Sequence, residues 1–459
     1  MPQHVGTQIF CDDAMLAQTE NVWRSVHHPA RHEANPVLIP DQPWEGYLVL
    51  QPGTVIWDEE DGCFKMWYNT QPSRDRPDAP LNLCYAVSAD GVHWEKPELG
   101  LVEFGGSTKN NILMQDVAWT HCVLKDAAER DAERRYKLLY WTPAGDGIHA
   151  AFSADGVRWR PWEDNPVVPR RATGDTFSVM RDPASGEYWL YHKTRTPARP
   201  IRMVSRMVSE DFLHWSGTRR VLAPDSFDPP DTQFYGLSAF PHAGQYLGVL
   251  WVYHTYLQTL DMQLVSSRDG LRWDRTADRK LFMHLVPTNE YRGGAFDRTQ
   301  IYPVSAPVER DGRLWLFYSG FTVPHNAPAA DHDGRIGLAT IRLDGFCSLD
   351  ATSPGYVLTR PFTWNGSQLR LNAATSGPSP EPSTDSSGGV RVQIEDEQGR
   401  PIPGFAAVQC IPFCGDETGA LMDWGGRSDL SELTGRAVQL RFELEATNLY
   451  SFSVCNGQE

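Results

Sequence analysis

The stretch Ser88-Ala89-Asp90-Gly91-Val92-His93-Trp94 decides the fold of this chain, because it returns almost unchanged as residues 153–159. Looser copies of the same motif stand at residues 209–215, 267–273 and 342–346. The aspartates of successive copies lie 65, 56, 58 and 75 residues apart. That spacing is too long for a helical repeat and suits a unit of about four strands, the size of one propeller blade.

Each copy follows an aromatic run that is typical of a strand, and a short acidic or glycine-containing turn precedes that run. The runs are residues 64–68, 136–140, 188–191, 246–253 and 314–318. Strand, turn, aromatic strand and Asp-Gly turn form the pattern of a β-meander. We expect the Ser and Asp of the motif to hold a tight turn and its Trp to pack between blades. The repeat therefore predicts a five-bladed β-propeller over roughly residues 40–360.

The character of the chain changes after Pro361. Residues 377–389 are rich in Pro, Ser and Gly, as expected of a linker or loop. Short alternating strands follow at residues 390–394, 438–442 and 449–452, which is typical of a small β-sandwich. The sequence thus predicts an all-β chain: residues 1–360 form the five-bladed β-propeller catalytic domain with an N-terminal extension, and residues 361–459 form a C-terminal β-sandwich.

Composition narrows the choice of partners. The 459 residues include 42 Lys and Arg against 58 Asp and Glu, a net charge of −16, which argues against nucleic acid or an anionic membrane. The 41% hydrophobic content excludes global disorder. No run of about 18 apolar residues occurs, and the N-terminus lacks a basic stretch followed by an apolar one. We therefore expect a cytoplasmic protein with no membrane partner.

The eight cysteines do not indicate a metal site. They are scattered, and only Cys410 and Cys414 are close together, with no second Cys or His pair to complete a zinc site. We expect reduced, mostly buried thiols, and neither a metal nor another cofactor.

Two sets of short sequence segments resemble those of a known family. Residues 35–38 (Asn-Pro-Val-Leu) with Trp44-Glu45-Gly46 are similar to first-blade openings, and Trp424-Gly425, residues 429–442 and residues 449–452 resemble a C-terminal sandwich. Both occur in glycoside hydrolase family 32, whose propeller is shared with families 43, 68 and 130. The resemblance covers nearly the whole chain and implies a glycosidase with acidic residues on the innermost strands, around a funnel at the propeller axis.

Cleavage of a glycosidic bond needs a protonated acid for the leaving oxygen and an ionised carboxylate as nucleophile or base. The innermost strand of each blade should precede the aromatic run, and carboxylates there are the catalytic candidates: Glu45, Asp175, Asp231 and Asp297. Asp175 is the strongest, because it follows Gly174 and opens an apolar strand where a charge has no structural reason to stand. Glu45 and Asp297 have plausible structural roles as a turn cap and a salt-bridge partner.

Residues at similar places are candidates for substrate binding through aromatic stacking or hydrogen bonds. They are Trp44, Gln51, His121, Tyr235, Glu290, Tyr291, Arg292, Arg298 and His325, with Trp119 and Gln300 as further aromatic and polar neighbours.

The chain departs from the family 32 pattern in two places. Where the family has a Trp-x-Asn-Asp-Pro motif that supplies the blade-one nucleophile, this chain has Gln51, which argues against fructan cleavage unless Glu45 substitutes. The triplet Arg181-Asp182-Pro183 resembles the second family motif, but it directly precedes Ala184-Ser185-Gly186. We therefore interpret it as a hairpin turn.

Three functions remain open from the sequence. The first is an exo-acting glycoside hydrolase for a small saccharide or glycoside. The second is a phosphorylase similar to family 130 enzymes, with phosphate held by Arg292, Arg298 and His325. The third is a propeller that binds carbohydrate without catalysis. The sequence leaves the sugar, the stereochemical outcome and a homo-oligomeric state open.

Overall fold

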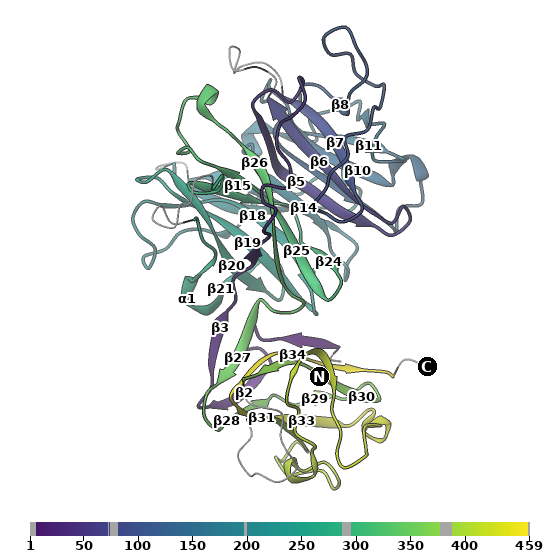
Figure 1. Cartoon of the computed structure of the whole chain (residues 1–459), viewed down its shortest axis with the longest axis vertical. Helices are drawn as coiled ribbons and strands as arrows, with labels where there is room; N and C mark the ends of the chain where they lie inside the picture. The colour runs from purple at the N-terminus through teal and green to yellow at the C-terminus, as the bar shows by residue number, and fades with distance from the viewer. Residues whose placement is uncertain are drawn as a thin grey trace.

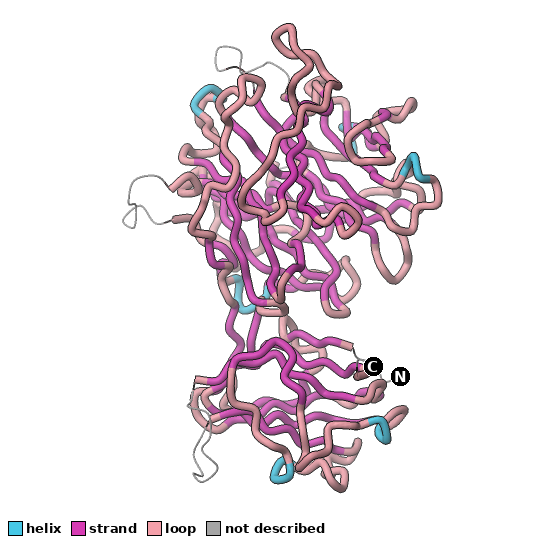
Figure 2. Tube along the Cα trace, turned by 45° about the vertical axis from the view of Figure 1, so that its right-hand side comes forward, coloured by secondary structure: helices cyan, strands magenta, loops and turns pink. Residues whose placement is uncertain are grey.

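The computed structural model describes residues 6–71, 73, 81–196, 200–286, 295–376 and 388–457. These residues form two bodies built almost entirely of strands (Figures 1 and 2). The described helical segments are single turns: α1 (Thr276–Arg279) and the 3-10 turns η1 (Ala132–Arg134), η2 (Arg170–Ala172), η3 (Ala329–Asp331), η4 (Ala407–Gln409) and η5 (Ser431–Leu433). In the described chain, no helix has the length and apolar character needed to cross a membrane. The protein is all-β, as the sequence predicts.

The larger body is a five-bladed propeller in which each blade is an antiparallel meander. Blade one contains β5 (Leu48–Asp58), β6 (Cys63–Gln71), β7 (Asn82–Ser88) and β8 (Ile112–Met114). Blade two contains β9 (Ala118–Lys125), β10 (Tyr136–Trp141), β11 (Gly147–Ser153), β12 (Arg160–Pro161) and β13 (Val168–Pro169). Blade three contains β14 (Phe177–Arg181), β15 (Tyr188–Arg195), β16 (Arg202–Ser209) and β17 (Arg219–Leu222).

The last two blades are joined by one parallel pairing, Leu260 with Gln300. Blade four contains β18 (Thr232–His242), β19 (Gln245–His254), β20 (Thr259–Ser267), β21 (Asp274–Arg275) and β22 (Leu281–Met283). Blade five contains β23 (Gln300–Pro303), β24 (Val308–Arg310), β25 (Arg313–Phe321), β26 (Arg335–Arg342) and β4 (Ala30–Arg31). The strand β4 comes from the N-terminal segment, so the two ends of the propeller sequence meet in blade five.

The repeated motif forms the predicted turn after the third strand of a blade. In the first copy, Ser88 Oγ accepts from the backbone N–H of Gly91 at 2.8 Å. The carboxylate of Asp90 accepts from the N–H groups of Val92 and His93 at 2.9 and 2.8 Å. Copies two, three and four repeat these bonds. The Ser and Asp are therefore structural in these four copies.

Motif residues also join neighbouring blades. The Trp94 ring of blade one packs edge-on against Phe317 of blade five, with centroids 5.7 Å apart. Trp67 of blade one donates to the carbonyl of Gly156 in the blade-two motif at 2.7 Å. Gly156 has φ +77°, and a Cβ there would lie 2.9 Å from the Trp67 ring, so glycine meets both demands at once. The prediction that the Trp of the motif packs between blades is confirmed for Trp94.

The fifth copy behaves differently. Asp344 accepts from His242 Nε2 at 2.7 Å and from Ser451 Oγ at 2.8 Å, because this copy has no Ser to organise the turn. The carboxylate instead bonds blade four to the smaller body. Residues 343–346 still form a turn, in which the Gly345 N–H donates to the carbonyl of Arg342 at 2.9 Å.

The smaller body is a two-sheet sandwich. One sheet contains β3 (Trp23–Val26), β27 (Cys347–Ala351), β34 (Thr447–Cys455), β30 (Gln368–Thr375), β32 (Asp416–Leu421) and β1 (Thr7–Ile9). The other contains β2 (Leu16–Glu20), β28 (Gly355–Thr359), β33 (Ala437–Glu445), β29 (Phe362–Thr363) and β31 (Gly389–Glu395).

The domain boundary differs from the one predicted at residues 360 and 361. The strands β1, β2 and β3 belong to the sandwich, and the sandwich resumes at β27 rather than after Pro361. The physical reason lies in the apolar core, where Phe10 and Met15 pack with Trp364 and Phe452. Figure 1 shows β3 and β27 side by side where the chain passes between the two bodies.

Candidate active site

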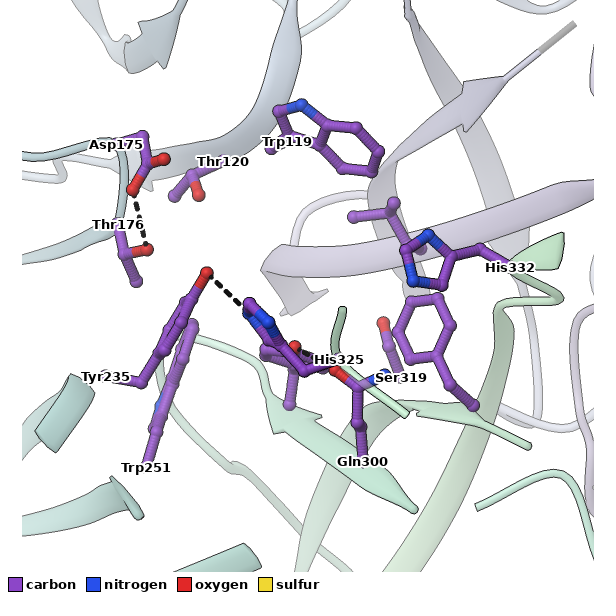
Figure 3. Close-up of a pocket in the computed structure, with 13 residues that line it drawn as sticks. Trp119, Thr120, Asp175, Thr176, Tyr235, Trp251, Gln300, Ser319, His325 and His332 are labelled. Carbon is purple, nitrogen blue, oxygen red and sulfur yellow. Dashed lines mark hydrogen bonds between the residues drawn. The ribbon is translucent and has the colours of Figure 1, made fainter. Parts of the chain in front are cut away.

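A cavity of about 220 Å³ lies where all five blades meet. Because the strands of a blade are antiparallel, the start of its innermost strand and the end of its second strand lie at the same face of the propeller. Both kinds of strand end line the cavity, together with the loop after β25. The lining residues are Leu50, Trp119, Thr120, Asp175, Thr176, Tyr235, Trp251, Gln300, Tyr302, Ser319, Phe321, His325 and His332 (Figure 3).

Aromatic rings make most of the wall. Trp251, Tyr302 and Phe321 are buried or nearly so, while Trp119 keeps 39% of its surface exposed above the opening. Tyr235 packs edge-on against Tyr302 with centroids 6.2 Å apart. Flat apolar walls with a few converging polar groups are typical of small-ligand sites, and aromatic faces suit the apolar face of a sugar ring.

Asp175 is the carboxylate that this cavity presents among the described residues. It comes two residues before β14 and keeps 47% of its side-chain surface exposed. Its Oδ1 accepts from Lys193 Nζ at 2.5 Å and, weakly, from Thr176 Oγ1 at 3.4 Å. Burial by itself would raise the pKa of Asp175, but the charge and hydrogen bond of Lys193 outweigh it and hold that pKa below the usual value. Asp175 is therefore an anion at neutral pH.

Lys193 lies behind Asp175 near the end of β15. Its side chain is buried, and its Nζ stands 3.9 Å from the centre of the Tyr235 ring as well as in contact with Asp175. The ammonium group is therefore fixed by one ion pair and one cation–π contact. This arrangement holds the carboxylate in one orientation toward the cavity.

Two histidines face Asp175 and Thr120 across the cavity (Figure 3). His325 Nε2 and Tyr235 Oη share a hydrogen bond of 3.0 Å, and His332 Nδ1 is buried with no hydrogen-bond partner among the described atoms. Burial lowers the pKa of both imidazoles. Both rings are therefore neutral near pH 7 and can each donate one N–H or accept one proton.

The structure places Glu45 away from the cavity. Glu45 is fully buried, and its carboxylate accepts from Tyr68 Oη at 2.6 Å, from Lys96 Nζ at 2.7 Å and from the N–H groups of Asp41 and Gln42. One oxygen thus accepts from the Tyr68 phenol and the other forms an ion pair with Lys96, so both have structural partners in blade one. This corrects the expectation that Glu45 reaches the funnel.

We expect Glu45→Ala to lower the free energy of unfolding by about 3 kcal/mol, because it leaves the Lys96 charge without its buried partner. Urea unfolding checks this, with the exposed Glu59→Ala as the matched control. The folded fraction of Glu45→Ala should keep its activity. A variant of normal stability that has lost turnover would return Glu45 to the catalytic set.

Two other predicted acids also have structural partners. Asp297 is buried and binds Arg31 Nε at 2.6 Å and Tyr318 Oη at 2.9 Å, which fastens β4 to blade five. Asp231, at the start of β18, accepts from the N–H of Tyr256 at 3.2 Å and so caps the turn after β19. Neither carboxylate lines the cavity.

The binding candidates divide in the same way. Tyr235 and His325 line the cavity, as do Trp119 and Gln300. The others are held elsewhere: Trp44 donates to Asn111 Oδ1 at 2.6 Å, His121 is buried against Asn69 and Trp67, and Arg298 donates to the carbonyl of Thr322. Glu290, Tyr291 and Arg292 lie outside the described residues, as does the side chain of Gln51.

The Arg181-Asp182-Pro183 triplet is a turn, in which Asp182 accepts from Ser185 and Tyr246.

The sequence analysis missed the cavity residues Trp251, Tyr302, Phe321 and His332, and the Lys193 that supports Asp175. Most of the predicted residues stand at or before the start of an innermost strand. In an antiparallel blade the last residues of the second strand reach the same face, so the end of each aromatic run and the positions just beyond it carry the signal for Trp251, Phe321 and Lys193. Lys193, two residues after the run 188–191, is the clearest case.

Comparisons with known proteins find carbohydrate-active proteins whose named activities differ from one another. No family model matches the chain. A curated relative, the A type blood N-acetyl-alpha-D-galactosamine deacetylase of Flavonifractor plautii, is 23% identical over 439 residues and 81% of this chain. The chain spans about half the length of that relative (54%).

Solved structures with similar folds include two other carbohydrate-active proteins. One, from a study of the GH130 family of mannoside phosphorylases and hydrolases, is 15% identical and covers 69% of this chain and 94% of its own, with a TM-score of 0.47. The other, a fructofuranosidase from Schwanniomyces occidentalis, is 11% identical and covers 93% and 98%, with a TM-score of 0.46.

Proposed function

We propose that this protein is a hydrolase that acts on the terminal sugar of a saccharide, with the cavity at the propeller axis as its active site. The observation that carries the proposal is Asp175, the one ionised carboxylate that the described residues bring to the cavity, set among aromatic walls and facing two neutral histidines. An anionic carboxylate can take a proton from water or attack a carbon atom. A cavity of about 220 Å³ has room for one sugar unit rather than for a longer stretch of chain.

The first candidate bond is the glycosidic bond, in line with the family that the sequence resembles. Asp175 then serves as base or nucleophile, because its low pKa excludes it as the proton donor. Within the described cavity the remaining titratable groups are neutral imidazoles and phenols, which are weak acids. The proton donor of a glycosidase would therefore be a residue other than these described groups, and we propose Glu290, which stands ten residues before β23 in the sequence.

We expect Glu290→Gln to separate the candidates. If Glu290 is the acid of a glycosidase, the variant no longer hydrolyses alkyl glycosides but still hydrolyses dinitrophenyl glycosides. A leaving group of low pKa, such as dinitrophenol, departs without being protonated. Rates with both substrates, measured for wild type and Glu290→Gln, check this. Equal loss on both substrates contradicts an acid role, and Glu163→Gln, an exposed residue of blade two, is the control.

The second candidate bond is the amide of an N-acetyl sugar. Two observations favour it: the one described carboxylate of the cavity, and the relative whose name is N-acetyl-galactosamine deacetylase. Asp175 would deprotonate water as it adds to the acetyl carbon, and imidazole or phenol donors would bind the oxyanion. When the C–N bond breaks, the protonated Asp175 returns that proton to the departing amine, which gives the acetyl group as acetic acid, ionised to acetate in water, and an amino sugar. This route needs no second carboxylate.

One assay tests the proposal as a whole. The protein is incubated with aryl glycosides and with matched acetylated and non-acetylated oligosaccharides, with and without phosphate, and both sugar and acetate are measured. Sugar release supports a glycosidase, and acetate release supports a deacetylase. Turnover that requires phosphate indicates a phosphorylase, and binding without any product indicates a carbohydrate-binding propeller; either result overturns the hydrolase proposal.

A further inference from the structure

A second hollow, of about 670 Å³, opens beside the axial cavity on blade three. The two share Asp175 as a common wall. The lining of the hollow includes polar side chains from the ends of β15, β16 and β17 and from η2. Five of its side chains are cationic: Arg170, Arg171, Lys193, Arg195 and Arg220.

This gathering of positive charge is unusual for the molecule. The chain has a net charge of −16, yet among the described residues that line the hollow the only carboxylate is Asp175, which already pairs with Lys193. Arg171, Arg195 and Arg220 are exposed, and among the described residues none of them forms an ion pair. By contrast, Arg275 and Arg279 of blade four each pair with aspartate, at 2.9 and 2.7 Å. Like charges held together without a partner repel one another, so they mark a place for an anion.

We propose that this hollow binds an anionic group carried by the saccharide, a carboxylate or a sulfate or phosphate ester, while the terminal sugar occupies the axial cavity. The inference rests on the proposed function, because it takes the axial cavity as the sugar site. A chain that leaves that cavity past Asp175 enters the hollow directly. Guanidinium groups bind such oxyanions through two parallel N–H bonds. The volume also falls within the range of about 300–1,000 Å³ that is usual for ligand sites.

Glycan binding tests the inference without requiring turnover. Wild type, the triple variant Arg171→Gln/Arg195→Gln/Arg220→Gln and Arg219→Gln are applied to arrays of neutral, uronate-containing, sulfated and phosphorylated glycans. Arg219 is the matched control, because neighbours on a strand point to opposite faces and Arg219 does not line the hollow. Inorganic phosphate is added as competitor in a separate series.

We expect wild type to bind anionic glycans more tightly than neutral ones. The affinity for anionic glycans should fall by about tenfold or more in the triple variant and stay unchanged in Arg219→Gln. Their binding should also fall with salt, unlike that of neutral glycans. A triple variant that matches Arg219→Gln, or no binding of anionic glycans, overturns the inference. Competition by phosphate without any preference for charged glycans also overturns it and assigns the hollow to free phosphate. Arginine-dependent binding in a protein that turns nothing over sustains the inference and rejects the hydrolase proposal alone.

Discussion

Asp175→Asn should reduce kcat/KM by about 10³-fold, whichever bond the protein cleaves. The substitution keeps the size of the side chain but removes the charge that the proposed mechanism uses to activate water or attack carbon. Asp175 is partly exposed to the cavity and belongs to no structural network beyond Lys193 and Thr176, so the fold should survive. Initial rates on the substrate found by product analysis check this result, and thermal unfolding checks the fold.

The matched control is Asp231→Asn. Asp231 also stands at the start of an innermost strand, but its carboxylate caps a turn and does not line the cavity. We expect its kcat/KM to stay within a few-fold of wild type. Full activity of Asp175→Asn would show that the chemistry belongs to another group. Equal losses in both variants would show that the site extends to the blade-four rim.

The blades could be predicted from the sequence because their signals are local. The hydrogen bonds of the Ser88 and Asp90 turn join residues at most three positions apart, so the motif carries its own structure wherever it occurs. The domain boundary could not be predicted in the same way. β1 pairs with β34 across more than 400 residues, and no local sequence signal near Thr7 predicts that pairing.

In the candidate site, too, the features with a local sequence signal could be predicted and those set by tertiary contacts could not. Asp175 was predictable because a charge directly before an apolar strand has no local explanation. Glu45 and Asp297 look similar in sequence, but their partners Lys96 and Arg31 are distant along the chain and come close only in the folded protein. The sequence therefore identifies acidic residues at strand ends, whereas tertiary contacts decide which of them stay available for chemistry.

Lys193→Met should move the acidic limb of the pH profile of kcat/KM to higher pH. Lys193 holds the pKa of Asp175 below its usual value, so the carboxylate stays ionised as the pH falls. Without that ammonium group, burial dominates and favours the protonated form. A base must be ionised to act, so activity is then lost at a higher pH than in wild type. Methionine keeps most of the packing against Tyr235, where Lys193 Nζ lies 3.9 Å from the ring centre.

The control separates positioning through charge from a merely structural role. Lys193→Arg retains a cation beside Asp175 and should keep the acidic limb near its wild-type position. If Lys193 served only in packing, Lys193→Arg and Lys193→Met would both lower the rate without moving the limb. Arg195→Gln removes a neighbouring charge that does not pair with Asp175 and should shift the limb less than Lys193→Met. A limb that stays in place in Lys193→Met would mean that the titrating group is not Asp175. The base that titrates in the pH profile would then be another group.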